Sequence, residues 1–184
     1  MRNISSVALL FVILLFAGCN DKKATKIDTI ENEIVENDTT VYGKCGNGTA
    51  MHTLELINAD GDTLVYSLES ADTCANIQGG LFVGDRLAVI EEKNKDGELF
   101  AKKVINITSL IGKWVSLNRS FDIQEGGVVV SNVTEPQPYT EWKILNGQLV
   151  LSSDTFDIYT LGPDSLYLEN KNGIFGYKRL LKSE

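Results

Sequence analysis

The side chains with the clearest capacity for chemistry are three cysteines and the chain's single histidine. If Cys19 belongs to an N-terminal leader, as argued below, two cysteines remain, Cys45 and Cys74. Two cysteines in an exported domain favour a structural disulfide. Free thiols, a redox pair and a metal site are the alternatives. A redox pair is usually close in sequence, as in Cys-x-x-Cys, and a metal site would need ligands besides His52. We therefore expect a Cys45–Cys74 disulfide, no metal and no cofactor.

No catalytic motif accompanies these residues. The sequence has no glycine-rich phosphate loop after a strand, no Gly-x-Ser-x-Gly and no His-Glu-x-x-His. A Cys45–His52 nucleophile pair would require Cys45 to be free, and carboxylates such as Glu141 and Asp154 fit solvated positions near turns. With 17 Lys+Arg against 25 Asp+Glu, the chain carries a formal net charge of −8. Because no catalytic motif is present, we expect no enzymatic activity. Because phosphate binding needs a clustered basic face, the acidic balance argues against a nucleic-acid partner.

Cys19 stands at the end of a leader. Arg2 precedes an apolar run of ten residues over 7–16, which is too short for a membrane-spanning helix of about twenty residues and is typical of a secretory signal. Ala17-Gly18-Cys19 resembles a bacterial lipobox, although Phe16 replaces the usual Leu, Val or Ile. The resemblance implies a lipoprotein signal peptide over 1–18 and palmitate-type acyl chains on Cys19. The alternative is an ordinary signal peptide in which Cys19 is incidental.

An acylated cysteine with several chains anchors a protein firmly to a membrane. We expect a lipid-anchored location in the cell envelope, on the outer membrane, although the residues after Cys19 do not distinguish the inner from the outer membrane. These residues lack the acidic cluster of a surface-export signal, which favours the periplasmic side. Residues 19–42 form the expected anchor and tether, since residues 20–41 contain no aromatic residue, Gly or Pro. A short amphipathic helix through Ile27, Ile30 and Ile34 is the alternative.

Beyond the tether, the apolar residues alternate with a period of two, which predicts strands. Leu54 and Leu56 flank a polar residue, and the loop at 58–62 contains the Gly that a hairpin turn needs. The run from Val83 to Val89, followed by a Lys/Asp/Gly turn, resembles part of an OB-type barrel. Residues 43–108 are therefore expected to form a small OB-like β domain.

A second set of strands begins after residue 109. Turn residues such as Asn146-Gly147 separate short apolar segments, and Asn-Gly is a strong type I′ hairpin signal. Eight strands at regular spacing predict an up-and-down meander that closes into a barrel. The fold class is therefore all-β, a small OB-like barrel followed by a compact eight-stranded barrel over 109–184. The predicted strands of the second barrel are 112–117, 120–124, 127–133, 139–145, 148–151, 155–161, 165–169 and 174–180.

Gly112-Lys113-Trp114 opens the first strand of this meander. A Gly-x-Trp in this place resembles the signature of the lipocalin, or calycin, superfamily, and segment 109–184 is similar to the lipocalin-like domains of Bacteroides-type lipoproteins. In that superfamily the Trp plugs the closed end of the barrel and a basic residue on the last strand packs across it. The resemblance implies barrel closure by Gly112 and Trp114, with Arg179 stacked on the indole. Lys178 is the neighbouring alternative.

The resemblance also implies a membrane-tethered, non-enzymatic protein that binds a small apolar ligand or an envelope partner. An eight-stranded barrel has an interior that side chains can fill, however. The alternative is therefore a structural or stress-sensing envelope protein with a solid barrel, no ligand and a role in protein–protein contacts. The candidate ligand contacts are aromatic residues near the expected barrel mouth, namely Tyr139, Trp142, Phe156 and Tyr159.

Overall fold

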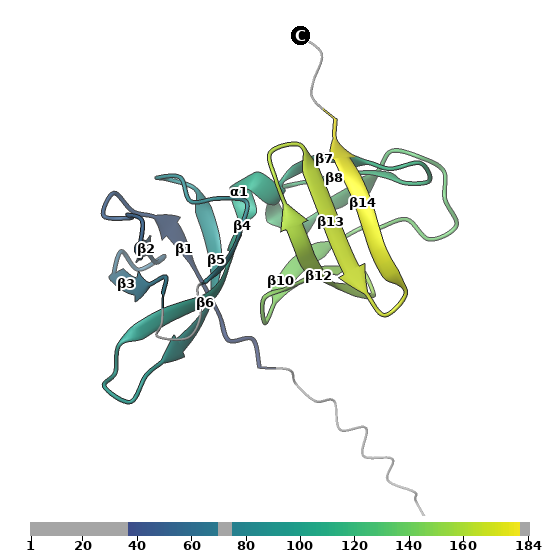
Figure 1. Cartoon of the computed structure of the whole chain (residues 1–184). Coiled ribbons are helices and arrows are strands. Elements are labelled where there is room, and N and C mark those ends of the chain that lie inside the picture. Colours follow the sequence, from purple (N-terminus) through teal and green to yellow (C-terminus); the bar gives the residue numbers. More distant parts are fainter. Residues whose placement is uncertain (1–36, 70–74, 181–184) are drawn as a thin grey trace, which may run out of the picture. The chain divides into compact units, whose positions relative to one another are not determined.

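A computed structural model describes residues 37–69 and 75–180 (Figure 1). These residues fall in one compact unit, Glu36–Glu184. The signal peptide, Cys19 and most of the tether that the sequence predicts lie outside the described residues, and so does Cys74. The described part is mostly strands, which form two sheets (Figure 1), and the predicted all-β fold class is confirmed.

The first sheet has the strand circuit of an OB-type barrel. Its order is β3-β2-β1-β5-β6-β4, and an additional parallel pairing of β3 with β6, at Ser67 and Phe100, closes five of the strands into a ring. The short β4 lies outside this ring and runs parallel to β6. The strands are β1 (Thr40–Cys45), β2 (Thr53–Ile57), β3 (Thr63–Ser67), β4 (Asn76–Gln78), β5 (Arg86–Lys93) and β6 (Leu99–Asn106).

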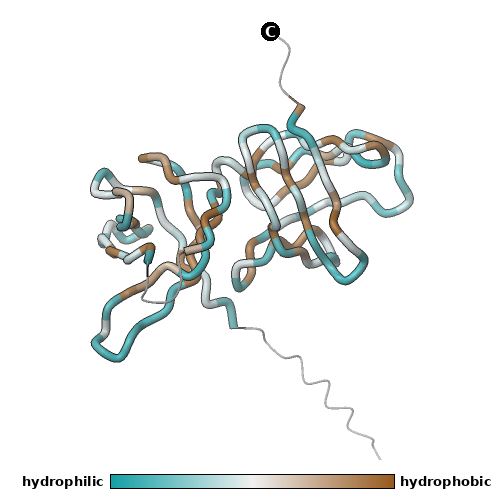
Figure 2. The backbone as a smooth tube through the Cα atoms, viewed as in Figure 1, coloured by the Kyte–Doolittle hydropathy of each residue, from teal (hydrophilic) through white to brown (hydrophobic). Residues whose placement is uncertain are grey.

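Two hairpin turns set the register of the first sheet. In each turn an Asn side-chain oxygen accepts hydrogen bonds from backbone N–H groups two and four residues further on, at Asn58 and again at Asn94. These Asx-type turns fix where each strand reverses. Alternate residues then point into the core, which contains Leu54, Leu56, Tyr66, Leu87, Val89 and Val104. Hydrophobic residues recur along the strands, and the hairpin turn between β5 and β6 is hydrophilic (Figure 2).

Strand β1 begins at Thr40, earlier than the sequence predicts. Thr40 and Val41 pair with Ile90 and Val89 of β5, although both were assigned to the tether over 19–42. The prediction relied on polar composition, whereas pairing with β5 and packing of Val41 against the core decide the outcome. Just before the strand, the Thr39 N–H donates to the Asn146 side-chain oxygen, 2.9 Å away.

The second sheet is the predicted eight-stranded meander. Its order is β10-β11-β12-β13-β14-β7-β8-β9, so the last strand pairs with the first through Arg179 and Trp114. A bridge between Val128 and Glu141 links the two outer ends, which makes the barrel nearly closed. The strands are β7 (Gly112–Val115), β8 (Ser120–Ile123), β9 (Val129–Ser131), β10 (Trp142–Leu145), β11 (Gln148–Leu151), β12 (Asp154–Leu161), β13 (Ser165–Asn170) and β14 (Gly173–Arg179), with a 3₁₀ turn at Glu125–Gly127.

A single short helix, α1 (Ile107–Leu110), joins the two sheets in the described part of the chain. Asn106 caps it by accepting a hydrogen bond from Ser109 N–H and is fully buried. Its amide group also donates to the Gly79 and Gly80 carbonyls and to the Asp85 carboxylate, at 3.3, 3.1 and 2.6 Å. Asn106 therefore ties the helix to the loop before β5.

Replacing this residue tests its role. We expect Asn106→Ala to lower the free energy of unfolding by about 2–4 kcal/mol, because a helix cap is lost and buried acceptors are left without a donor. Chemical denaturation of the variant measures the change. Asn118→Ala, at an exposed position, is the matched control and should remain within roughly 0.5 kcal/mol of the parent. Equal stability of the two variants would contradict this role for Asn106.

Candidate functional site

The structure brings together the three residues that the sequence assigned to barrel closure. Trp114, in β7, is fully buried, and its indole N–H donates to the Leu110 carbonyl at 2.8 Å. Arg179, at the end of β14, lies across it with the guanidinium carbon 4.2 Å from the centre of the ring. This separation is well within cation–π range. The stack covers the indole at the point where the first and last strands meet.

The guanidinium also binds three backbone carbonyls. Its Nε donates to Pro163 at 2.6 Å, Nη1 donates to Ile111 at 2.9 Å and Nη2 donates to Ser109. Burial lowers the pKa of Arg179 from its ordinary value, but a guanidinium remains charged in proteins. The Arg179 guanidinium therefore links the end of β14, the turn before β13 and the helix α1.

Gly112 leaves the room that this contact needs. Its φ is 139°, and a Cβ at this position would stand 2.5 Å from Nη1 of Arg179. A larger residue would have to displace the guanidinium and adopt an unfavourable backbone conformation. The Gly-x-Trp pattern thus has a local physical reason in this chain.

The barrel interior is filled with aromatic and aliphatic side chains. Phe121 contacts Tyr139 and Tyr177 edge-on at ring-centre distances of 5.6 and 5.0 Å, and Phe156 contacts Tyr139 at 6.5 Å. Edge-to-face pairs at these distances are favourable. The aliphatic residues buried around them are Ile123, Val129, Ile144, Leu149, Leu151, Ile158, Leu161, Leu166 and Leu168.

The four residues that the sequence placed at a barrel mouth do not form one site. Tyr139 and Phe156 are buried in the core, at 6% and 3% exposure. Trp142 is half-buried, and its indole N–H donates to the Gln124 carbonyl at 2.7 Å. Tyr159 is 60% exposed and points outward. Tyr159 follows the alternation of β12, in which Phe156 and Ile158 are buried, so the period of two itself places this side chain on the outer face.

A second cation–π contact was missed at the sequence level. The Arg119 guanidinium lies 4.3 Å from the centre of the Tyr139 ring, and it also pairs with Glu135 at 3.4 Å. Burial raises the pKa of Tyr139 to about 12, although the Arg119 charge acts against this shift. No motif marks Arg119, because its partners come from a loop far along the chain.

The cysteine and histidine predictions have different outcomes. Cys45 is buried, and its thiol lies 3.3 Å from the Thr49 hydroxyl. Its proposed partner Cys74 lies outside the described residues, so the disulfide stays a prediction. His52 is exposed and pairs with the Glu69 carboxylate at 2.9 Å. Within residues 37–69 and 75–180, no group of three or more His, Cys, Asp or Glu is placed to hold a metal ion.

Comparison with known proteins supports a lipocalin-like domain. A family model described as lipocalin-like matches residues 106–180, which span the whole second sheet. Proteins of this family are generally non-enzymatic binding proteins, so the barrel indicates a binding role. No curated protein and no solved structure matches the chain significantly. The described ranges contain no helix with the length and apolar character needed to cross a membrane.

Substitution of the arginine tests the closure of the barrel. We expect Arg179→Lys to lower the free energy of unfolding by about 2–4 kcal/mol, because an ammonium group cannot replace the fork that binds three carbonyls. Thermal or chemical unfolding measures the loss. Lys178 precedes Arg179 and is exposed, so the control Lys178→Met should leave the free energy of unfolding nearly unchanged. Full stability of Arg179→Lys would show that charge alone, without the fork, closes the barrel.

Proposed function

We propose that the chain is a membrane-tethered, non-enzymatic binding protein of a Bacteroides-type envelope, whose lipocalin-like barrel is a solid scaffold. Recognition then takes place on the outer surface, and the partner of the barrel is an envelope protein. The filled interior is the observation that carries this proposal. Phe121, Tyr139 and Phe156 pack against one another within the buried core of the barrel.

The size of the barrel explains why a packed interior follows. Pockets for small ligands usually have a volume of about 300 Å³ or more. An eight-stranded barrel provides such a space only when some inward residues are small. Here the inward residues are Phe, Tyr, Trp, Leu, Ile and Val, and those in the core are almost completely buried.

The outer surface of the barrel offers a contact region of a suitable kind. Tyr159 of β12 and Tyr167 of β13 are 60% and 43% exposed, and Tyr167 is paired with Thr160, next to Tyr159. The ring of Tyr167 lies over Gly176, where a Cβ would come within 3.0 Å of it. Tyrosines are enriched at protein interfaces. We call Tyr159 and Tyr167 the tyrosine face.

The leader supports the tether. Cleavage before Cys19 and acylation of its sulfur would place the barrels on the outer membrane, facing the periplasm, on a chain that begins at Cys19. A tether of polar composition between the anchor and β1 allows the folded part to reach partners at the membrane surface. A Cys45–Cys74 disulfide is compatible with this oxidising location.

The solid scaffold predicts a difference between the parent protein and a cavity variant. Phe156→Ala should open an apolar cavity that binds toluene, so toluene raises the thermal midpoint of the variant and leaves that of the parent unchanged. If this variant is too unstable, Leu168→Ala creates a smaller cavity at a buried neighbour. Saturable stabilisation of the parent by toluene or by neutral 1-decanol would contradict a filled barrel.

The tether and the partner are tested in cells. The parent protein should fractionate with membranes and yield a specific cross-link to an envelope protein, whereas Cys19→Ser should lose membrane association. Tyr159→Ser combined with Tyr167→Ser should stay at the membrane and lose the cross-link. Lys171→Ser, at an exposed turn, should keep both. Unchanged fractionation of Cys19→Ser would contradict the lipid anchor, and a cross-link independent of both tyrosines would contradict the tyrosine face.

A further inference from the structure

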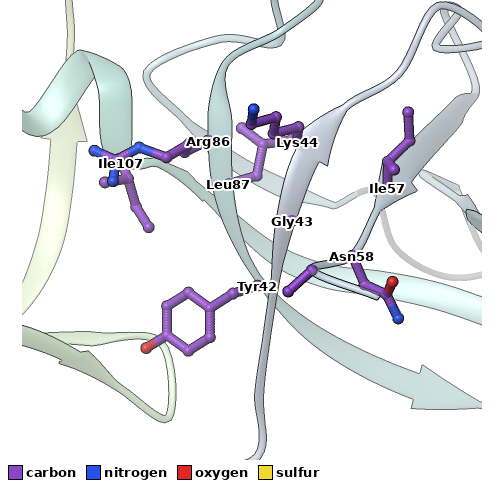
Figure 3. Close-up of a pocket in the computed structure, with 9 residues that line it drawn as sticks. Tyr42, Gly43, Lys44, Ile57, Asn58, Arg86, Leu87 and Ile107 are labelled. Carbon is purple, nitrogen blue, oxygen red and sulfur yellow. The ribbon is translucent and has the colours of Figure 1, made fainter. Parts of the chain in front are cut away.

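The first sheet carries a cavity that plays no part in the barrel closure. Its volume is about 480 Å³, within the range of small-molecule sites. Figure 3 shows Tyr42 and Lys44 along β1, with Arg86 from the neighbouring β5 and Ile57 from the end of β2. No carboxylate is among the residues that line it.

The base of this cavity is formed by the backbone of β1, because the side chains of the strand alternate between its two faces. Tyr42 and Lys44 are exposed on the outer face, whereas Gly43 between them faces inward, since a Cβ there would meet Leu56 at 2.7 Å. Its partner across the ladder, Leu87, is fully buried in the core of the first sheet. The Gly43–Leu87 pair therefore places no side chain on the outer face of the sheet, and a hollow remains there.

Two cationic residues from neighbouring strands line the hollow. Lys44 and Arg86 are directly opposite across β1 and β5, an arrangement of like charges that is unfavourable without a counter-charge. Arg86 is partly neutralised, because its Nη2 contacts both carboxylate oxygens of Glu125 at 2.6 and 2.7 Å. Within the part of the chain that the structure describes, Lys44 has no ion-pair partner. An excess of positive charge thus lines this cavity in a chain with a net charge of −8.

The walls beside these cations are apolar. Ile57 is 37% exposed, and Ile107 stands at the start of α1. The Tyr42 ring is held in place because its hydroxyl donates to the Ile144 carbonyl at 2.8 Å. The hydroxyl is therefore engaged, and the ring presents its apolar face to the cavity. A wall fixed in this way reduces the ordering cost of binding.

We infer that this cavity binds a small organic carboxylate. The carboxylate lies between Lys44 and Arg86, and the apolar body of the ligand lies against Tyr42, Ile57 and Ile107. Two cations match a carboxylate in charge, and Arg matches it in shape. The site belongs to the first sheet, so it stands whether or not the barrel has a protein partner on the tyrosine face.

Calorimetric titration of the full chain carrying Cys19→Ser, in a neutral detergent, tests the inference with 2-naphthoate as the probe. A dissociation constant of about 1 mM or below is expected for a ligand of this size. The neutral isostere 2-naphthalenemethanol should bind at least about tenfold more weakly, because it gains no ion pair. Lys44→Met keeps the apolar stem and should weaken 2-naphthoate binding by a similar factor, whereas Lys102→Met, an exposed lysine on β6, should not.

A gain of affinity provides a second readout. Glu125→Gln removes the carboxylate that competes for Arg86, so this variant should bind 2-naphthoate several-fold more tightly. Equal binding of the acid and the alcohol, or unchanged affinity in both Lys44→Met and Glu125→Gln, would overturn the inference. Binding of a peptide with a free C-terminal Phe, without any binding of 2-naphthoate, would also overturn it and assign the cavity to a protein terminus.

Discussion

The Arg179 guanidinium, stacked on Trp114, connects segments that are distant in the sequence. It lies at the end of β14 and covers the indole of Trp114 in β7. It donates hydrogen bonds to the carbonyls of Ser109 in α1, of Ile111 just after α1 and of Pro163 in the turn before β13. The meander can close only where β14 meets β7, and the stack lies at that junction. Because one of its acceptors belongs to α1, the same contact also fixes the end of the barrel against the connection to the first sheet.

Closure at this end and a filled interior leave no internal space for a ligand among the described residues of this lipocalin-like barrel. The aromatic cluster around Phe121 gives the barrel a rigid core, so the side chains that remain available for recognition are those on the outer faces. Residues of the first sheet also take part in this buried core. Ala88 and Ile105 of the first sheet belong to the same buried core as the barrel residues, and Gly79 N–H donates to the Leu161 carbonyl at 3.0 Å.

Features encoded by local pattern were predictable from the sequence. The strand alternation, the turns at Asn58 and Asn146 and the Gly-x-Trp opening depend on neighbouring residues. The stack of Arg179 on Trp114 was expected from the resemblance to the lipocalin superfamily and not from local pattern. Features that depend on tertiary packing were not predictable. The early start of β1 follows from its pairing with β5. The Arg119–Tyr139 stack and the buried Asn106 network join loops whose proximity no motif records.

The most direct test of a solid barrel is a crystal of the protein exposed to pressurised xenon, which enters empty apolar cavities. The packing of Phe121, Tyr139 and Phe156 predicts that no xenon atom binds among these three rings. A well-occupied xenon site inside the barrel would contradict this account, because it would reveal a space in which a small apolar ligand could lie.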